Sequence, residues 1–294
     1  MIPRFAHARP GSLVEAFEAF DAAGGDAAWY AGGTELLQVM KMGLARFGTL
    51  IDLKGIPELR RISTDVTGGI VIGGTATHRE IERNPAVQSV APALAALAGE
   101  VANPRVRNQG TLGGNLCFAE PHSDPATFLL ACDARVELRG KSGAREGAIG
   151  DFLVGPFATD RAADEILVSV RIPPAGAGEG RAYQKIVFRE RPAVSVAVRL
   201  RVADGAIVEA RVVVGSMLDV PAVVPDAGAA LVGAAADPAA STHLDRPMAA
   251  AAAAVSDLPA EDDLDGSADY KRHLAGVLLR RAARAAVSEA RARA

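Results

Sequence analysis

Two glycine-rich segments are the parts of this sequence best suited to bind a phosphate-bearing ligand. The first is Ala31-Gly32-Gly33-Thr34-Glu35-Leu36-Leu37, and the second is Gly110-Thr111-Leu112-Gly113-Gly114-Asn115. The diphosphate of a dinucleotide needs close approach of the backbone, free N–H donors and often a positive φ, all of which glycine permits. Neither segment has the G-x-G-x-x-G spacing of a Rossmann fingerprint. Because glycine pairs are also common in ordinary turns, the glycines alone leave a purely structural role open.

The residues around the glycines are more specific than the glycines themselves. Residues 107–116, Arg-Asn-Gln-Gly-Thr-Leu-Gly-Gly-Asn-Leu, followed by Pro-His-Ser-Asp-Pro at 121–125, closely resemble the second FAD-binding segment of the molybdenum hydroxylase flavoproteins. These are the FAD-binding medium subunits related to carbon monoxide dehydrogenase and to the FAD domain of xanthine dehydrogenase. Residues 31–37 resemble their first segment, and residues 164–173 and 183–185 also look like the family. The similarity covers nearly the whole chain.

The resemblance implies that FAD lies extended between two lobes. The residues that it assigns to FAD are Ala31, Gly32, Gly33, Thr34, Glu35 and Leu36 on one side of the diphosphate, Thr111, Gly113, Gly114 and Asn115 on the other, and Asp124, Leu167 and Lys185 further along the chain. Asp124 would bond the adenosine portion, and Lys185 near the N1/O2 edge of the flavin would favour its anionic reduced form. Other roles stay open, since Asp124 could cap a helix, Leu167 could be a core residue and Lys185 a solvated one.

The expected fold is α+β. The resemblance implies a two-lobed FAD-binding domain of the vanillyl-alcohol-oxidase (PCMH) type over residues 1–175, with lobes of about 1–54 and 55–175. A small C-terminal α+β domain of the carbon monoxide dehydrogenase flavoprotein type, a three-stranded sheet plus helices, would occupy 176–294. Residues 173–180 are the best linker candidate, because five of these eight residues are Pro or Gly.

Local patterns predict the elements that position the two segments. Capping boxes at 12–15 and 77–80 each predict a helix start, and Asp204-Gly205 predicts a hairpin turn. The first helix is predicted to start at Ser12 and to stop at Gly24-Gly25, and a short helix is predicted to start at Thr77. The other predicted helices are 35–42, 92–101, 124–130, 247–255 and 269–287, with Pro247 at the start of its helix. The predicted strands are 27–31, 49–53, 69–74, 135–138, 165–172, 183–188, 193–202 and 206–214. Residues 103–109 are predicted to be a polar loop that leads into a second loop at 110–115.

Composition excludes several other functions. The two cysteines, Cys117 and Cys132, are too few for an iron–sulfur cluster, and no two histidines lie at ligand spacing, so no metal site is expected. The formal net charge of −3 gives no reason to expect nucleic acid. No apolar run is long enough to span a bilayer, and the first residues lack the apolar core of a signal peptide. We therefore expect a soluble, cytoplasmic protein with no transmembrane segment.

The resemblance also implies partner chains. In this family a large molybdopterin subunit hydroxylates the substrate, and electrons pass through two [2Fe-2S] clusters on a small subunit to FAD on the medium subunit. The complex would be a dimer of heterotrimers, and no catalytic acid, base or nucleophile is assigned to this chain. Two alternatives stay open: a self-sufficient flavin oxidoreductase on the same fold, and a non-catalytic nucleotide-binding module. The sequence indicates neither the substrate nor the final electron acceptor.

Overall fold

The first lobe is a small parallel sheet with two helices. The computed structural model describes residues 2–236 and 241–293. Its first elements are β1 (Ala6–Ala8), α1 (Leu13–Ala22), β2 (Ala27–Tyr30), α2 (Leu36–Lys41) and β3 (Thr49–Asp52), with strand order β1-β3-β2 and parallel pairing throughout. Ser12 caps α1 by accepting from the backbone amide of Glu15. The first glycine segment connects β2 to α2, as the predicted strand–loop–helix required.

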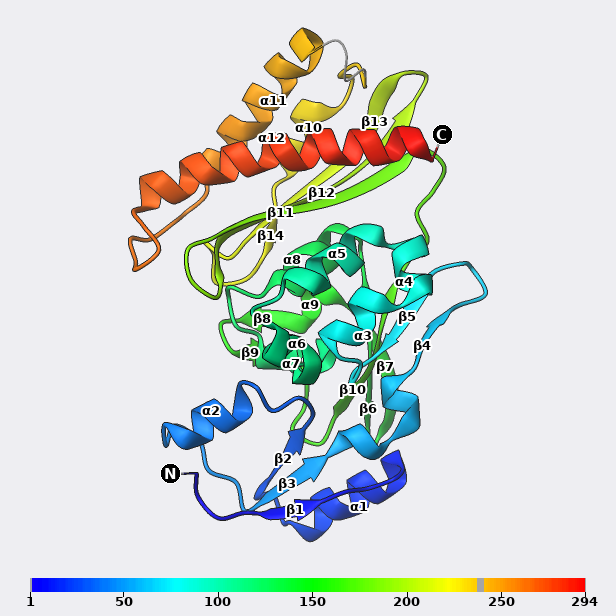
Figure 1. Cartoon of the computed structure of the whole chain (residues 1–294), viewed down its shortest axis with the longest axis vertical. Helices are drawn as coiled ribbons and strands as arrows, with labels where there is room; N and C mark the ends of the chain where they lie inside the picture. The colour runs from blue at the N-terminus through cyan, green and yellow to red at the C-terminus, as the bar shows by residue number, and fades with distance from the viewer. Residues whose placement is uncertain (1, 237–240, 294) are drawn as a thin grey trace.

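The second lobe is a five-stranded antiparallel sheet covered by short helices (Figure 1). Its strand order is β4-β5-β10-β6-β7. The 3-10 helices η1 (Leu53–Gly55) and η2 (Pro57–Arg60) lead into it from the first lobe. The strands are β4 (Ile62–Thr64), β5 (Ile70–Gly73), β6 (Arg135–Gly140), β7 (Gly143–Ala148) and β10 (Ile166–Ile172), and a separate two-stranded pair is β8 (Leu153–Gly155) with β9 (Ala158–Thr159). The helices are α3 (His78–Arg83), α4 (Pro85–Val90), α5 (Pro92–Glu100), α6 (Pro104–Gln109), α7 (Leu112–Phe118), α8 (Asp124–Ala131) and α9 (Ile149–Phe152).

The remaining residues form a separate antiparallel sheet with three helices. The strands are β11 (Glu179–Val187), β12 (Pro192–Ala203), β13 (Ala206–Gly215) and β14 (Ala222–Val223), and the helices are α10 (Pro225–Leu231), α11 (Ser241–Ser256) and α12 (Ala268–Ala292). The predicted hairpin at Asp204-Gly205 is confirmed, with φ values of +50° and +75°. Three strands were predicted, and the short β14 is a fourth.

Both faces of this last sheet are buried. The helix α12 covers one face, and α8 of the second lobe packs against β12 and β13 on the other (Figure 1). Along β12, Val196 and Val198 belong to the core beneath α12, whereas Ala197 belongs to the core of the second lobe. Burial on both sides explains why β12 is a nearly continuous apolar run.

Three predictions about local structure are wrong. Residues 103–109 contain a helix, α6, because Asn103 caps it by accepting from the amides of Arg105 and Val106. The second glycine segment is also not a loop, since Thr111 caps α7 and Leu112 begins it. Pro247 lies inside α11 and not at its start. The other predicted elements lie where expected, to within a few residues at their ends.

No helix among the described residues combines the length and the apolar character needed to cross a membrane.

Candidate functional site

The two glycine segments touch each other where the two lobes meet. A Cβ atom added to Gly32 would overlap the carbonyl oxygen of Gln109 and lie 2.8 Å from Cα of Gly110. Gly33 has a φ of +70°, which a side chain would strain. Ala31 lies 3.8 Å from the position that a Cβ on Gly114 would take. The lobes therefore approach at backbone distance, and glycine is needed for that approach.

The first segment presents a row of backbone donors. Within the described part of the chain, the N–H groups of residues 32–36 have no protein acceptor, and no side chain caps α2. These residues are only partly exposed. Consecutive amides without protein acceptors at the start of a helix are suited to bind an anion. This arrangement fits the predicted role of Gly32, Gly33, Thr34, Glu35 and Leu36 beside a diphosphate.

The second segment differs, because its amides are already used. The N–H groups of Leu112 and Gly113 donate to the carbonyls of Ala76 and Gly74, at 3.0 and 2.9 Å. Those of Gly114 and Asn115 donate to the hydroxyl and carbonyl of Thr111. We therefore expect this segment to pack closely against a ligand without donating hydrogen bonds to it from the backbone.

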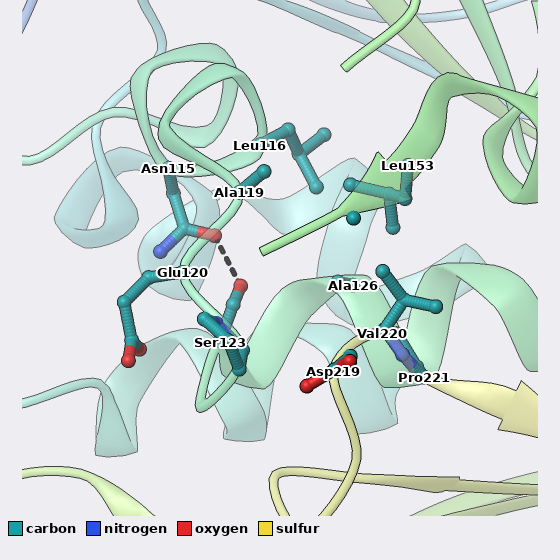
Figure 2. A pocket seen from close by; sticks show the side chains of 12 residues that line it. Asn115, Leu116, Ala119, Glu120, Ser123, Ala126, Leu153, Asp219, Val220 and Pro221 are labelled. Atoms are coloured by element: carbon teal, nitrogen blue, oxygen red, sulfur yellow. Dashed lines mark hydrogen bonds between the residues drawn. The ribbon is translucent and has the colours of Figure 1, made fainter. Parts of the chain in front are cut away.

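Asn115 is the side chain of the second segment that is free to donate. Ser123 donates its hydroxyl to Oδ1 of Asn115 at 2.6 Å, which leaves the NH₂ group of Asn115 for another acceptor (Figure 2). The space beside this pair is a cavity of about 10 Å³, enough for about one water molecule. This cavity is therefore too small to hold a dinucleotide.

Asp124 and Lys185 form a buried ion pair. Oδ1 of Asp124 lies 2.9 Å from Nζ of Lys185 and accepts from the hydroxyl of Tyr183 at 2.6 Å. Burial raises the pKa of Asp124, while Lys185 and Tyr183 oppose that rise. Ser123 occupies the cap position of α8, so the alternative that Asp124 caps this helix is wrong. Asp124 instead fixes Lys185, whose Nζ also donates to the carbonyl of Glu100.

Leu167 lies on β10 and packs against Gly74, next to the second segment. It is 5% exposed and belongs to the core of the second lobe. A Cβ on Gly74 would overlap its carbonyl oxygen, and Gly74 in turn packs against Gly113. The ladder between β10 and β6 shifts register after Leu167. The structure therefore places the side chain of Leu167 in the core, and its contact with FAD stays a prediction.

Arg191 is a site residue that the sequence did not indicate. It lies in the turn between β11 and β12 and contacts Glu35 of the first segment at 3.0 Å and Glu120, after α7, at 2.8 Å. Hydrogen bonds from His122 and Arg191 lower the pKa of Glu120, although burial opposes this. The C-terminal sheet is thus tied to the first glycine segment and to the residues that follow α7. No local pattern could reveal contacts between residues so far apart in the chain.

Among the residues that the structure describes, His122, Asp263 and Asp265 form a set of groups with ligand chemistry, which the spacing of the histidines did not suggest. Donor atoms of His122, Asp263 and Asp265 lie within 4.8 Å of one another. However, Lys271 lies 2.5 Å from Asp263, and Arg189 lies 3.5 Å from Asp265. Because cations already neutralise both carboxylates, the set is better described as an ion-pair network than as a metal site.

A cavity of about 350 Å³ lies between the lobes on the side of Tyr30. It is lined by Tyr30, Gly32, Lys54, Arg60, Thr75, Thr77, Asn108 and Gln109. Cations, hydroxyls and amides therefore converge next to the first glycine segment. This volume is at the low end for ligand sites, of roughly 300–1,000 Å³, so the cavity suits one part of a large ligand.

Acidification is expected to destabilise the second segment through His78. His78 is buried, its amide donates to the carbonyl of Gly110, and burial followed by the charge of Arg107 lowers its pKa to about 4. In the unfolded chain this histidine takes up its proton near pH 6.5. The contribution of neutral His78 to the free energy of unfolding is therefore fully present above that pH and is lost as the pH falls toward 4. Between pH 7.5 and pH 5, we expect the free energy of unfolding of the original chain to fall by about 2 kcal/mol more than that of His78→Phe. Urea denaturation at both pH values measures this, and equal losses in the two proteins would contradict it.

Two family models match this chain, one over the two lobes and one over the C-terminal sheet and its helices. The family model described as "FAD binding domain in molybdopterin dehydrogenase" matches residues 3–175, and that of the "CO dehydrogenase flavoprotein C-terminal domain" matches residues 189–286. The chain is 35% identical to the nicotine 6-hydroxylase medium subunit of Paenarthrobacter nicotinovorans, covering 95% of this chain and 96% of that protein. It is 32% identical to the carbon monoxide dehydrogenase medium chain of Hydrogenophaga pseudoflava, covering 97% of each. A solved structure of carbon monoxide dehydrogenase from the same organism superposes with a TM-score of 0.90 at 32% identity, covering 98% of this chain and 99% of that one.

Proposed function

The chain belongs to the FAD-binding medium subunits of molybdenum hydroxylases, and from that premise we propose how its residues hold FAD and serve electron transfer. The observation that carries the proposal is the row of backbone amides at residues 32–36, which lack protein acceptors in the described chain and lie where the two glycine segments meet. The diphosphate of FAD supplies the acceptors that these amides need. Once bound, the flavin supplies the chemistry of accepting and releasing electrons.

We assign Lys185 to the flavin end of the site. An ammonium group has three N–H donors, and Asp124 and Glu100 accept two of them. The third is available to a ligand acceptor, and its position is fixed because both protein partners are themselves held. Asp124 then acts by positioning Lys185. The expected contact between Asp124 and the adenosine portion stays a prediction, because the bonds to Lys185 and Tyr183 use only Oδ1 of Asp124.

The iron–sulfur clusters and the molybdopterin belong to partner chains in this proposal. The chain has only Cys117 and Cys132, too few for the four thiolates that a cluster usually takes. Electrons would arrive from [2Fe-2S] clusters on a small subunit, and a large molybdopterin subunit would hold the substrate. We propose a dimer of heterotrimers, as the resemblance implies, and a location in the cytoplasm. The final acceptor is not assigned.

Isolation of the native complex tests this function. The tagged full chain, purified from cells that make it naturally, is expected to carry two further chains together with molybdenum, iron and acid-labile sulfide. Mass spectrometry identifies the chains, and elemental analysis measures the metals. A preparation that turns over a substrate without molybdenum- or iron-bearing chains would instead support the self-sufficient flavin oxidoreductase.

A further inference from the structure

A group of buried hydroxyls joins the second lobe to the C-terminal sheet. Oγ of Ser195 on β12 lies 3.1 Å from Oγ1 of Thr127 on α8 and 2.9 Å from Oγ of Ser216, which follows β13. None of these three residues is more than 2% exposed. A Cβ on Gly215 would overlap Oγ1 of Thr127, so the two parts of the chain pack closely here. Hydroxyls buried in this way bond to protein groups and not to bulk water.

The register of the sheet connects these hydroxyls to the buried ion pair. Lys185 on β11 lies directly opposite Ser195, and Tyr183 lies two residues earlier on the same face of the sheet. Tyr183 donates to Oδ1 of Asp124, and its own oxygen is hydrogen-bonded by Ser195. Asp124 begins α8, one turn before Thr127. The hydroxyl group therefore continues through Tyr183 to Asp124 and Lys185.

The number of protons fixes the direction of these bonds. Each hydroxyl has one proton to donate and two lone pairs that accept. Tyr183 gives its proton to Asp124, so the bond between Tyr183 and Ser195 uses the proton of Ser195. Ser195 then accepts from both Thr127 and Ser216. The bond dipoles all point toward the carboxylate of Asp124, and each strengthens the next in a site of low dielectric constant.

Asp124 needs this support, because its surroundings oppose a negative charge. Burial raises its pKa, and the charge of Glu120 after α7 acts in the same direction, whereas Lys185 and Tyr183 on β11 lower it. Burial and the charge of Asp124, with a smaller effect of Glu100 on α5, raise the pKa of Tyr183 well above 10. The phenol therefore keeps its proton and remains a donor to Asp124.

We propose that Tyr183, supported by Ser195, keeps Asp124 ionised and thereby sets the net charge that the flavin meets at Lys185. The inference rests on the proposed function, which assigns Lys185 to the flavin end of the site. While Asp124 is ionised, its charge balances that of Lys185. When Asp124 is protonated, the positive charge of Lys185 is no longer balanced, and this favours the anionic reduced flavin. Tyr183 is thus a positioning residue, because it acts on the flavin through Asp124.

Tyr183→Phe tests the proposal, because phenylalanine keeps the ring and removes the hydroxyl. Without this donor, Asp124 takes up a proton at a higher pH. In the full chain reconstituted with FAD, we expect the equilibrium constant for reduction of the flavin at pH 5.5 to rise about tenfold, which is about 30 mV for a two-electron couple. At pH 8, where Asp124 is ionised in both proteins, the two potentials should be equal. A spectroscopic titration against a dye of known potential measures both.

Two further variants bracket this result. Ser195→Ala removes the hydroxyl behind Tyr183 and should raise the potential at pH 5.5 by a smaller amount. It also provides the test if Tyr183→Phe does not fold. Tyr270→Phe is the matched control, since Tyr270 is 45% exposed and lies outside this group of hydroxyls. It should leave the potential unchanged at both pH values.

The dependence on pH separates the proposal from a structural role. A hydroxyl with only a structural role would lower the melting temperature or the FAD affinity without changing the potential, and unchanged potentials at both pH values would overturn the proposal. An equal shift at pH 5.5 and pH 8 would also contradict it, because Tyr183 would then not act through the protonation of Asp124. An original full chain that takes up no FAD would instead reject the proposed function.

Discussion

Replacing Gly32 with alanine is expected to weaken FAD binding by about tenfold to a hundredfold. The new methyl group would overlap the carbonyl oxygen of Gln109, and a backbone carbonyl cannot move aside as a flexible side chain can. The two lobes must then separate at the place where the diphosphate is held. Overpacking of this kind costs about 1–3 kcal/mol, and each 1.4 kcal/mol changes a binding constant tenfold. Flavin retained per chain after gel filtration measures the effect.

Gly147→Ala is the matched control. Gly147 lies on β7, has no atom within 4 Å of its added Cβ, and does not have a positive φ. This variant should keep FAD at the level of the original chain. Normal FAD retention in a folded Gly32→Ala protein would show that FAD does not bind where the lobes meet. Gly114→Val is a less clean test, because its Cβ would first meet Oγ1 of Thr111, which caps α7.

Replacing Asp124 with alanine is expected to lower the free energy of unfolding by about 3–5 kcal/mol, which is the typical cost of removing one partner of a buried ion pair. The side chain of Lys185 is 9% exposed and would keep only the carbonyl of Glu100, and Tyr183 would lose its acceptor. Urea denaturation of the flavin-free chain measures the loss. FAD binding should weaken as well, because Lys185 is no longer held in position.

Two further variants separate this cause from others. Asp160→Ala removes a carboxylate whose partner, Arg145, is 41% exposed, and it should cost about 1 kcal/mol or less. Adding Lys185→Met to Asp124→Ala should restore part of the lost stability, because the unpaired buried charge is removed. A loss of only about 1 kcal/mol in Asp124→Ala would fit the helix-cap role that the structure rejects.

The α+β fold and the two glycine segments could be predicted because their determinants are local. The capping box at Thr77–Glu80 and the Asp204-Gly205 turn act over a few residues, and both have the expected geometry. The apolar run of β12 likewise indicated a strand, since both of its faces are buried. Residues 107–125 identified the family through their order alone.

The remaining features of the site depend on contacts between distant residues. Arg191 meets Glu35 only because the turn after β11 folds back over the first lobe. The second segment resembled a donor loop, but its amides donate to Gly74 and Ala76, whose positions depend on β5. Residues 103–109 were assigned to a loop because α6 is too short to show an apolar period.

The most direct test of the central claim is the amount of FAD that this chain itself binds. The purified full chain is incubated with FAD, freed of unbound cofactor, denatured, and the released flavin is quantified by its absorbance against the protein concentration. We predict a stoichiometric amount of FAD in the original chain and in Gly147→Ala, and a small fraction of that in Gly32→Ala. A folded chain that carries no FAD after this reconstitution would contradict the account.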